Sequence, residues 1–192
     1  NYFKKKVEKN KFYLGEVSIP EIINPENFSK RAHRKIILNN SIHLIDLAHY
    51  FFGNLYLKDV EYIFSKKNKI SSFTFKLYNS KCSILFNSIA NQTKNTQFEI
   101  FDGENTFNFL PLEKLQVQKG FEIKDFAGTT NYLPKIIHTM DEYKDTYKPG
   151  FIKQAKEFKK LVLGKNPNIP NLNDAFKSIK VIEEIDEQLK VK

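Results

Sequence analysis

Closely spaced apolar segments between residues 57 and 110 constrain the fold of this 192-residue chain more than any other feature. They cover about 57–65, 70–78, 82–90, 96–103 and 106–110, and each is rich in Phe, Ile, Val, Tyr or Thr. Such composition between turn-forming pairs, here Asn79-Ser80 and Asp102-Gly103, predicts β-strands. Because parallel strands need long crossovers, links this short predict an antiparallel meander.

A helix is predicted just before these strands, over residues 39–52. Asn39, Asn40 and Ser41 are good N-cap residues, and Gly53 is suited to the left-handed position that closes a helix. The helix is apolar on two of its three stripes, which predicts burial between other elements. The polar segment 24–35, with the basic cluster Lys30–Lys35, is predicted to be a loop.

The remaining segments complete an α+β pattern. Residues 2–10 read as the tail of a helix, 11–23 as a strand, and 150–163 and 172–190 as amphipathic helices, whereas 111–150 give no clear prediction. The expected fold is one domain over residues 1–192, with an open, largely antiparallel sheet and helices on one face. The strands 70–78 and 82–90 are apolar at both alternating positions, so we expect the other face to bind a second copy of the chain.

Composition narrows the possible partners. The formal net charge is +9, but only two of the basic residues are arginines and the lysines are scattered, which indicates a compositional bias more than a nucleic-acid surface. A basic nucleic-acid-binding domain is therefore the least favoured alternative. No apolar run is long enough to predict a membrane span, and we expect no membrane partner and a cytoplasmic location. The single cysteine, Cys82, excludes an internal disulfide, and no metal site is expected.

Candidate chemistry centres on one histidine. The sequence has no Gly-rich phosphate loop and no paired metal-ligand spacing, and His33, His49 and His138 are interpreted as isolated surface or packing residues. His43 is expected in the first helical turn, where the helix dipole favours a neutral ring that accepts a proton from a hydroxyl. Asp46, three residues on, is placed to orient it. A structural role for both residues, in capping the helix and pairing, remains open.

The segment Ser41-Ile42-His43-Leu44-Ile45-Asp46-Leu47, with Gly53 after it, resembles the His-x-Ile-Asp-Leu helix of the glucose–fructose oxidoreductase, inositol dehydrogenase and rhizopine-catabolism (Gfo/Idh/MocA) family. Two further landmarks follow in the family's order: the strand–turn–strand segment 98–105, and residues 150–158 with Asn173-Asp174-Ala175 before the last helix. The resemblance covers nearly the whole chain.

The resemblance implies the substrate-binding and assembly domain of an NAD(P)-dependent oxidoreductase that acts on a sugar, inositol or nucleotide sugar. His43 would be the catalytic acid/base and Asp46 its orienting partner. Asn39, where the family often has Asp, would bind a substrate hydroxyl. Arg31 and Arg34, in the basic cluster Lys30–Lys35, are candidates to bind a phosphate or another anionic part of the substrate, and a solvated basic turn is the alternative for this cluster.

NAD or NADP would bind to an upstream Rossmann domain missing from this chain. We therefore expect no cofactor to bind to the chain alone and no turnover by it, and a homo-oligomer as the assembled state. A non-catalytic binding or scaffold module of the same fold is the alternative.

Overall fold

The computed structural model describes residues 2–8, 10–21, 30–65, 70–90, 92–141 and 150–190, and side chains within these ranges apart from 30–37 and 189–190. The elements are α1 (Tyr2–Lys6), β1 (Tyr13–Glu21), α2 (Lys30–Phe52), β2 (Tyr56–Phe64), β3 (Ile70–Tyr78), β4 (Cys82–Ala90), β5 (Gln97–Phe101), β6 (Asn105–Phe109), β7 (Lys114–Phe126), β8 (Thr129–Asp141), α3 (Phe151–Val162) and α4 (Leu172–Lys190).

The strands form one eight-stranded sheet in the order β2-β3-β4-β1-β5-β6-β7-β8. Every neighbouring pair is antiparallel apart from β1 and β4, which run parallel. The parallel pair arises because α2 and the β2–β4 meander form the long crossover that returns the chain to the side of β1. The predicted open, largely antiparallel sheet is confirmed.

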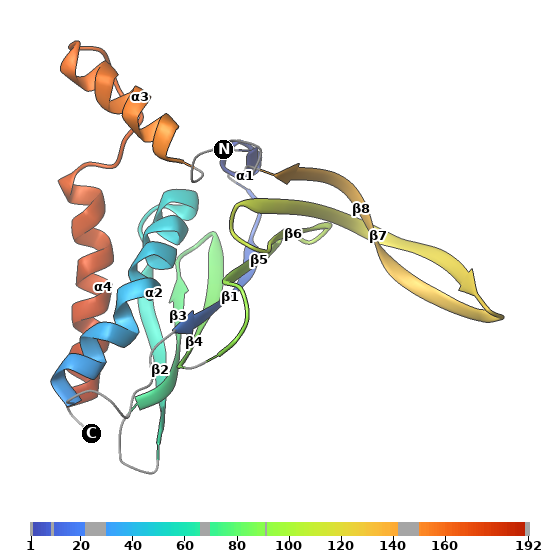
Figure 1. The fold of residues 1–192 in the computed structure, drawn as a ribbon, viewed down its shortest axis with the longest axis horizontal. Coiled ribbons are helices and arrows are strands. Elements are labelled where there is room, and N and C mark those ends of the chain that lie inside the picture. The colour runs from blue at the N-terminus through green and yellow to red at the C-terminus, as the bar shows by residue number, and fades with distance from the viewer. Residues whose placement is uncertain are drawn as a thin grey trace.

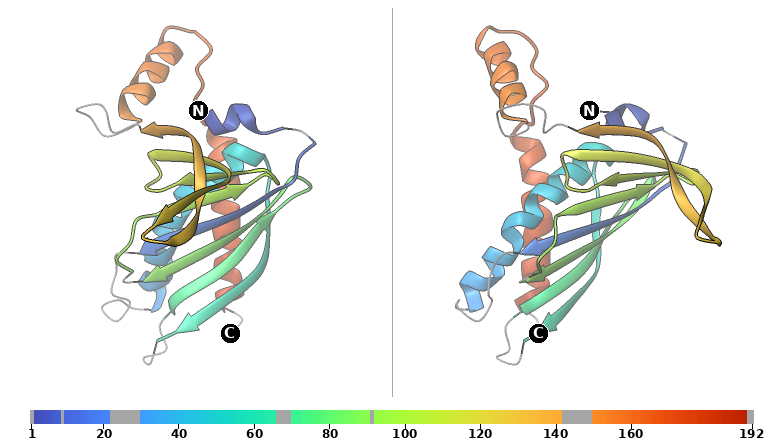
Figure 2. Two further views of the ribbon diagram at one scale, coloured as in Figure 1. Left: turned by 90° about the vertical axis from the view of Figure 1, so that its right-hand side faces the viewer. Right: turned by 45° about the vertical axis from the view of Figure 1, so that its right-hand side comes forward.

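Helices α2 and α4 lie side by side on one face of the sheet (Figures 1 and 2). Alternating residues of β3 and β4, such as Phe73, Phe75, Ile84 and Phe86, point to these helices and are almost fully buried. Their alternates, such as Thr74 and Leu85, lie on the opposite face and are partly exposed. The α+β class with helices on one face is therefore also confirmed.

Helix α2 begins nine residues before the position that the sequence predicted, at Lys30 instead of Asn39. The prediction of a loop at 30–35 and of N-caps at Asn39–Ser41 is wrong. Lys, Arg and Ala are strong helix formers, and no Gly or Pro interrupts the segment from Lys30 to Phe52. The predicted end is confirmed, since Gly53 has φ +83° and its N–H donates to the His49 carbonyl at 2.8 Å.

The supposed cap residues instead contact a buried carboxyl. Glu21, at the end of β1, is fully buried and accepts hydrogen bonds from Asn40 Nδ2 at 2.9 Å, Ser41 Oγ at 3.3 Å and Ser88 Oγ at 3.4 Å. Burial raises the pKa of the Glu21 carboxyl to about 7, although these three hydrogen bonds lower it.

The region without a clear prediction, 111–150, contains β7 and β8, a long hairpin that projects from the sheet (Figure 1). Its two-residue turn, Ala127-Gly128, has positive φ at both positions, as a tight hairpin turn requires. Pro134 is tolerated because β8 is the edge strand. In the projecting part of this hairpin, apolar side chains are exposed on both faces. Its sequence therefore lacks the alternation of apolar and polar residues by which a strand is predicted.

The last two helices match their predicted ranges but differ in packing. Helix α3 has no buried residue, and it stands clear of the sheet in Figures 1 and 2. Helix α4 buries Ser178, Val181 and Ile185, whereas its apolar residues Phe176 and Ile179 are exposed.

Candidate functional site

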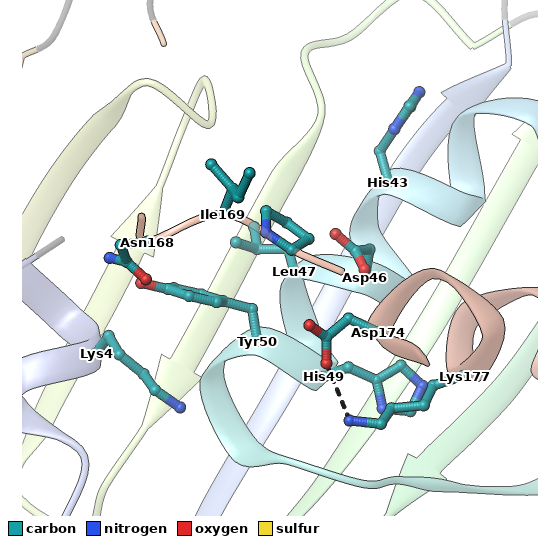
Figure 3. Close-up of a pocket in the computed structure, with 11 residues that line it drawn as sticks. Lys4, His43, Asp46, Leu47, His49, Tyr50, Asn168, Ile169, Asp174 and Lys177 are labelled. Carbon is teal, nitrogen blue, oxygen red and sulfur yellow. Dashed lines mark hydrogen bonds and ion pairs between the residues drawn. The ribbon is translucent and has the colours of Figure 1, made fainter. Parts of the chain in front are cut away.

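The polar stripe of α2 borders a hollow of about 490 Å³ on the helical side of the molecule (Figure 3). The stripe contributes His43, Asp46 and Tyr50, and α1, the segment before α4 and the first turns of α4 close the other sides. The remaining lining residues are Lys4, Leu47, His49, Asn168, Ile169, Pro170, Asp174 and Lys177.

His43 is exposed at the edge of this hollow. Its predicted position in the first helical turn is wrong, because α2 begins at Lys30, more than three turns earlier. The argument from the helix dipole therefore fails, because that effect is confined to the first turn. His43 reaches the hollow because it lies on the polar stripe of α2, not because it lies at the start of the helix.

Asp46 lines the same hollow but does not orient His43 in this structure. Its Oδ1 accepts a hydrogen bond from Ser178 Oγ of α4 at 3.3 Å, and Figure 3 shows the His43 ring directed away from the carboxylate. Among the described residues no hydrogen bond joins the two side chains. The hydrogen bond from Ser178 instead joins α4 to α2. The spacing of residues within α2 cannot predict this contact, because the donor comes from another helix.

The start of α4 places two more charges at the hollow. Asn171 Oδ1 accepts the backbone N–H groups of Asn173 and Asp174, and Asp174 Oδ2 accepts the N–H of Asn171 at 3.1 Å, which is a capping box. Asp174 Oδ1 accepts a hydrogen bond from Lys177 Nζ at 3.1 Å. The backbone bond and then the lysine lower the pKa of Asp174. Sequence analysis missed both charges, although Asn171-x-x-Asp174 is a recognisable capping pattern.

His49 lies in the last turn of α2 and is 8% exposed. Its Nδ1 is 3.1 Å from the Gly53 carbonyl oxygen, whereas Nε2 is buried and has no hydrogen-bond partner among the described residues. Burial is the main cause that lowers the pKa of His49. Interpreted from sequence as a packing residue, His49 does pack, but it also lines the hollow. His138, by contrast, stacks on Tyr2 with ring centroids 4.4 Å apart.

Lys4 borders the hollow from α1. Its Nζ donates to the Phe51 carbonyl at 2.8 Å and lies 5.4 Å from the centroid of the Tyr50 ring. Burial, and then the charge of Lys81, lower the pKa of Lys4. This lysine therefore fixes α1 to the end of α2 as well as adding positive charge.

The other predicted site residues are not gathered at this hollow. Asn39 is exposed one turn before His43 and lines a separate hollow of about 320 Å³, with Leu38, Ile42, Ile182, Glu183 and Asp186. Arg31 and Arg34 belong to the first turns of α2, but their side chains lie outside those that the structure describes. Their proposed contact with an anion stays a prediction.

No group of three or more His, Cys, Asp or Glu residues within the described ranges could hold a metal ion. No helix in that part of the chain is long and apolar enough to cross a membrane.

The fold of this chain matches that of one part of several dehydrogenases of known structure. The chain aligns over 97% of its length with a dehydrogenase (MviM) from Clostridium difficile, with a TM-score of 0.69 and 16% identity, and spans 58% of that protein. It aligns equally far with the UDP-N-acetylglucosamine 3-dehydrogenase GnnA from Acidithiobacillus ferrooxidans, with a TM-score of 0.64, 12% identity and 56% of that chain.

A levoglucosan dehydrogenase, solved with NADH and levoglucosan, matches with a TM-score of 0.62 and 16% identity, over 97% of this chain and 58% of the other. No family model matches the chain, and no curated protein matches its sequence. The structural matches confirm the expected fold, that of the C-terminal domain of Gfo/Idh/MocA dehydrogenases. This chain accounts for less than two thirds of the length of each matched protein.

Proposed function

We propose that this chain is the substrate-binding and assembly domain of an NAD(P)-dependent oxidoreductase that acts on a hydroxyl of a sugar, inositol or nucleotide sugar. The observation that carries the proposal is the position of His43 at the edge of a polar hollow, within a fold shared with sugar and nucleotide-sugar dehydrogenases. An imidazole that reaches a hollow is suited to accept a hydroxyl proton near neutral pH.

The cofactor does not fit this chain by itself. A dinucleotide pyrophosphate is usually held by a Gly-rich turn at a helix N-terminus, and the sequence contains no such turn. NAD or NADP would therefore be held by a Rossmann domain in another part of the full-length protein. The contribution of this chain would be to bind the substrate and to accept the proton at His43.

The exposed apolar face of α3 supports the presence of a further domain. Phe151, Phe158 and Val162 are 58%, 60% and 69% exposed on a helix without a buried residue. A stripe of this kind is expected to pack against a partner. A nucleotide-binding domain of the same polypeptide would supply that partner.

The assembly role rests on the uncovered face of the sheet. A mostly apolar row of paired residues crosses it, from Phe101 through Leu14, Ser83 and Tyr78 to Tyr56. Phe101, Leu14 and Tyr78 are 44%, 54% and 41% exposed. We expect a second copy to cover this row, so Leu14→Glu should shift the protein toward monomer in sedimentation velocity. A wild-type protein that stays monomeric at high concentration would contradict the assembly role.

The test of the catalytic role is His43→Asn in the full-length protein. Loss of a positioned acid/base group lowers turnover by a factor of about 10² to 10⁴. The affinity for the nicotinamide cofactor should be unchanged, because this chain does not hold it. His138→Asn is the matched control, since that ring stacks on Tyr2 away from the hollow. Asn39 lines a separate hollow, so Asn39→Ala tests whether the substrate extends to that side of α2. If it does, the change should lower substrate affinity more than turnover, because an amide cannot relay a proton.

The alternative is a non-catalytic module of the same fold. It rests on Asn39, which stands where the resemblance implies an Asp in many family members, because an amide cannot take a proton. Near-normal turnover in His43→Asn would remove His43 from the reaction. Absence of turnover in the full-length wild-type protein, with substrate binding retained, would favour the non-catalytic module.

A further inference from the structure

His49 presents an unused hydrogen-bond acceptor at the wall of the hollow that contains His43. Its Nδ1 lies 3.1 Å from the Gly53 carbonyl oxygen. Because a carbonyl oxygen only accepts hydrogen bonds, Nδ1 must carry the hydrogen in this contact. In a neutral ring the other nitrogen, Nε2, then has a free lone pair and no hydrogen.

The surroundings keep this ring neutral. Burial lowers the pKa of His49, the Gly53 carbonyl raises it, the Lys177 ammonium lowers it, and the Asp46 carboxylate raises it. The net effect lowers the pKa, so the tautomer set by Gly53 persists at neutral pH.

The lone pair on Nε2 is unsatisfied. The atom is buried and has no partner within the described part of the chain. A buried acceptor without a partner destabilises the structure that contains it. Since His49 itself lines the hollow, a ligand bound there can supply the missing donor once Nε2 is uncovered.

The other lining groups restrict what that ligand is. Two carboxylates, of Asp46 and Asp174, face two ammonium groups, of Lys4 and Lys177, so the lining has no net charge when His43 is neutral. Leu47, Ile169 and Pro170 add apolar surface. Mixed donors and acceptors around an apolar wall fit a neutral molecule with several hydroxyl groups better than a free phosphate or carboxylate.

We propose that His49 determines specificity in this hollow: its Nε2 accepts a hydrogen bond from one hydroxyl of a neutral polyhydroxylated ligand. This inference rests on the proposed function and adds a second histidine, with a role separate from that of His43. His43 exchanges a proton with the reacting hydroxyl, whereas His49 recognises another hydroxyl and selects against molecules that lack a donor there. A site built around a buried acceptor rejects such molecules strongly, because the acceptor is left unpaired.

Because Nε2 is buried, a ligand reaches it only if neighbouring side chains move. The Lys177 side chain lies beside the His49 ring and forms an ion pair with Asp174 (Figure 3). This pair is about 40% exposed, with side-chain values of 39% and 41%. Exposed ion pairs contribute little to stability, so a ligand can displace Lys177 at little cost.

The experiment combines changes on the protein with changes on the ligand, in the full-length protein. Levoglucosan, D-glucose and myo-inositol are the probes, and the tightest binder is then compared with analogues in which one hydroxyl at a time is replaced by fluorine. Fluorine keeps the size of the group but cannot donate. His49→Asn is the protein change, because the Asn amide can still donate to the Gly53 carbonyl while the acceptor at Nε2 is lost.

We expect one fluorinated analogue to bind wild-type protein about tenfold more weakly than its parent, as for a lost hydrogen bond of this kind. His49→Asn should weaken the parent by a similar factor and bind that analogue and its parent equally. If the affinity ratio of parent to analogue is the same in His49→Asn as in wild-type protein for every analogue, the inference about His49 fails. The proposed function of His43 would not be affected by that result. If none of the three probes binds wild-type protein, both this inference and the proposed substrate class fail.

Two controls separate recognition from folding. His49→Asn should unfold at a temperature close to that of wild type if the Gly53 bond is kept. Should it not fold, the nitrogen chemical shift of His49 Nε2 in wild-type protein supplies the answer: it should move on addition of the parent and not on addition of the weak analogue. Equal movement with both ligands would overturn the inference.

Discussion

Helices α3 and α4 carry similar sequence patterns but have different environments. Both show apolar residues at helical spacing, yet α4 buries Val181 and Ile185, whereas α3 buries nothing. Helix α4 is also bonded to other elements, through Ser178 Oγ to Asp46 and through its Ile185 carbonyl, which accepts from Tyr62 at 3.1 Å. An amphipathic pattern therefore shows that a helix has an apolar contact to make, but not that the contact lies within the same domain.

The largest test of this difference is a pair of truncations. Ile185→Ala in α4 removes a fully buried side chain and should cost about 2–5 kcal/mol in the free energy of unfolding. Phe158→Ala in α3 removes a larger side chain that is 60% exposed, and should cost less than about 0.5 kcal/mol. Urea denaturation of this 192-residue chain measures both.

The same pair tests whether a further domain covers α3. In the full-length protein Phe158→Ala should become clearly destabilising, while the effect of Ile185→Ala stays similar. A cost above about 1.5 kcal/mol for Phe158→Ala in the chain alone would mean that α3 packs within this domain, and the comparison would fail.

A second test compares two carboxyl groups. Glu21 is buried where β1 contacts α2, whereas Glu157 lies on α3 and is partly exposed. Because folding raises the pKa of Glu21 from 4.5 to about 7, the folded state binds more protons than the unfolded state between these values. Stability should therefore fall as the pH rises through this window, by at most about 3 kcal/mol, and level off above it.

Glu21→Gln should remove this dependence, since an amide oxygen still accepts from Ser41 and Ser88 and does not ionise. Glu157→Gln is the control and should leave the dependence of the unfolding free energy on pH unchanged. A wild-type profile that is flat between pH 5 and 8 would show that the buried carboxyl does not titrate there.

The smallest effect concerns the polar tie between the helices. Ser178→Ala removes the hydrogen bond to Asp46 and should cost about 1 kcal/mol. Lys160→Met in α3 breaks an exposed ion pair with Glu157 and should cost less than about 0.5 kcal/mol. Thermal unfolding measures both losses of stability. Equal losses for Ser178→Ala and Lys160→Met would show that the hydrogen bond of α4 stabilises the protein no more than the exposed ion pair of α3.

The sequence predicted best where neighbours along the chain determine the structure. Strands β3 and β4 match their predicted ranges, because turn residues such as Asn79 bound them and their side chains alternate. The start of α2 was misplaced because three capping residues were read locally, whereas Asn40 and Ser41 in fact donate to Glu21, about 20 residues earlier.

The site was predictable only in part, for a similar reason. Helical spacing placed His43 and Asp46 on one stripe, and both do line one hollow. Lys177 and Asp174 come from a helix more than 120 residues further along, and no local pattern assigns them to that hollow. The free acceptor on His49 depends on the Gly53 carbonyl and on burial, which are properties of the packed structure.

The position of β1 has a consequence for how the molecule folds. β2–β4 and β5–β8 are each joined by short connections, so each half of the sheet can form from contacts between residues close in sequence. β1 precedes both halves in the chain but lies between them, paired with β4 on one side and β5 on the other. Joining the halves thus requires closure of loops of many tens of residues, which is slow compared with hairpin formation. Until β1 inserts, β4 and β5 each have a free edge. Insertion of β1 must therefore be faster than the pairing of those edges between molecules, which would lead to aggregation.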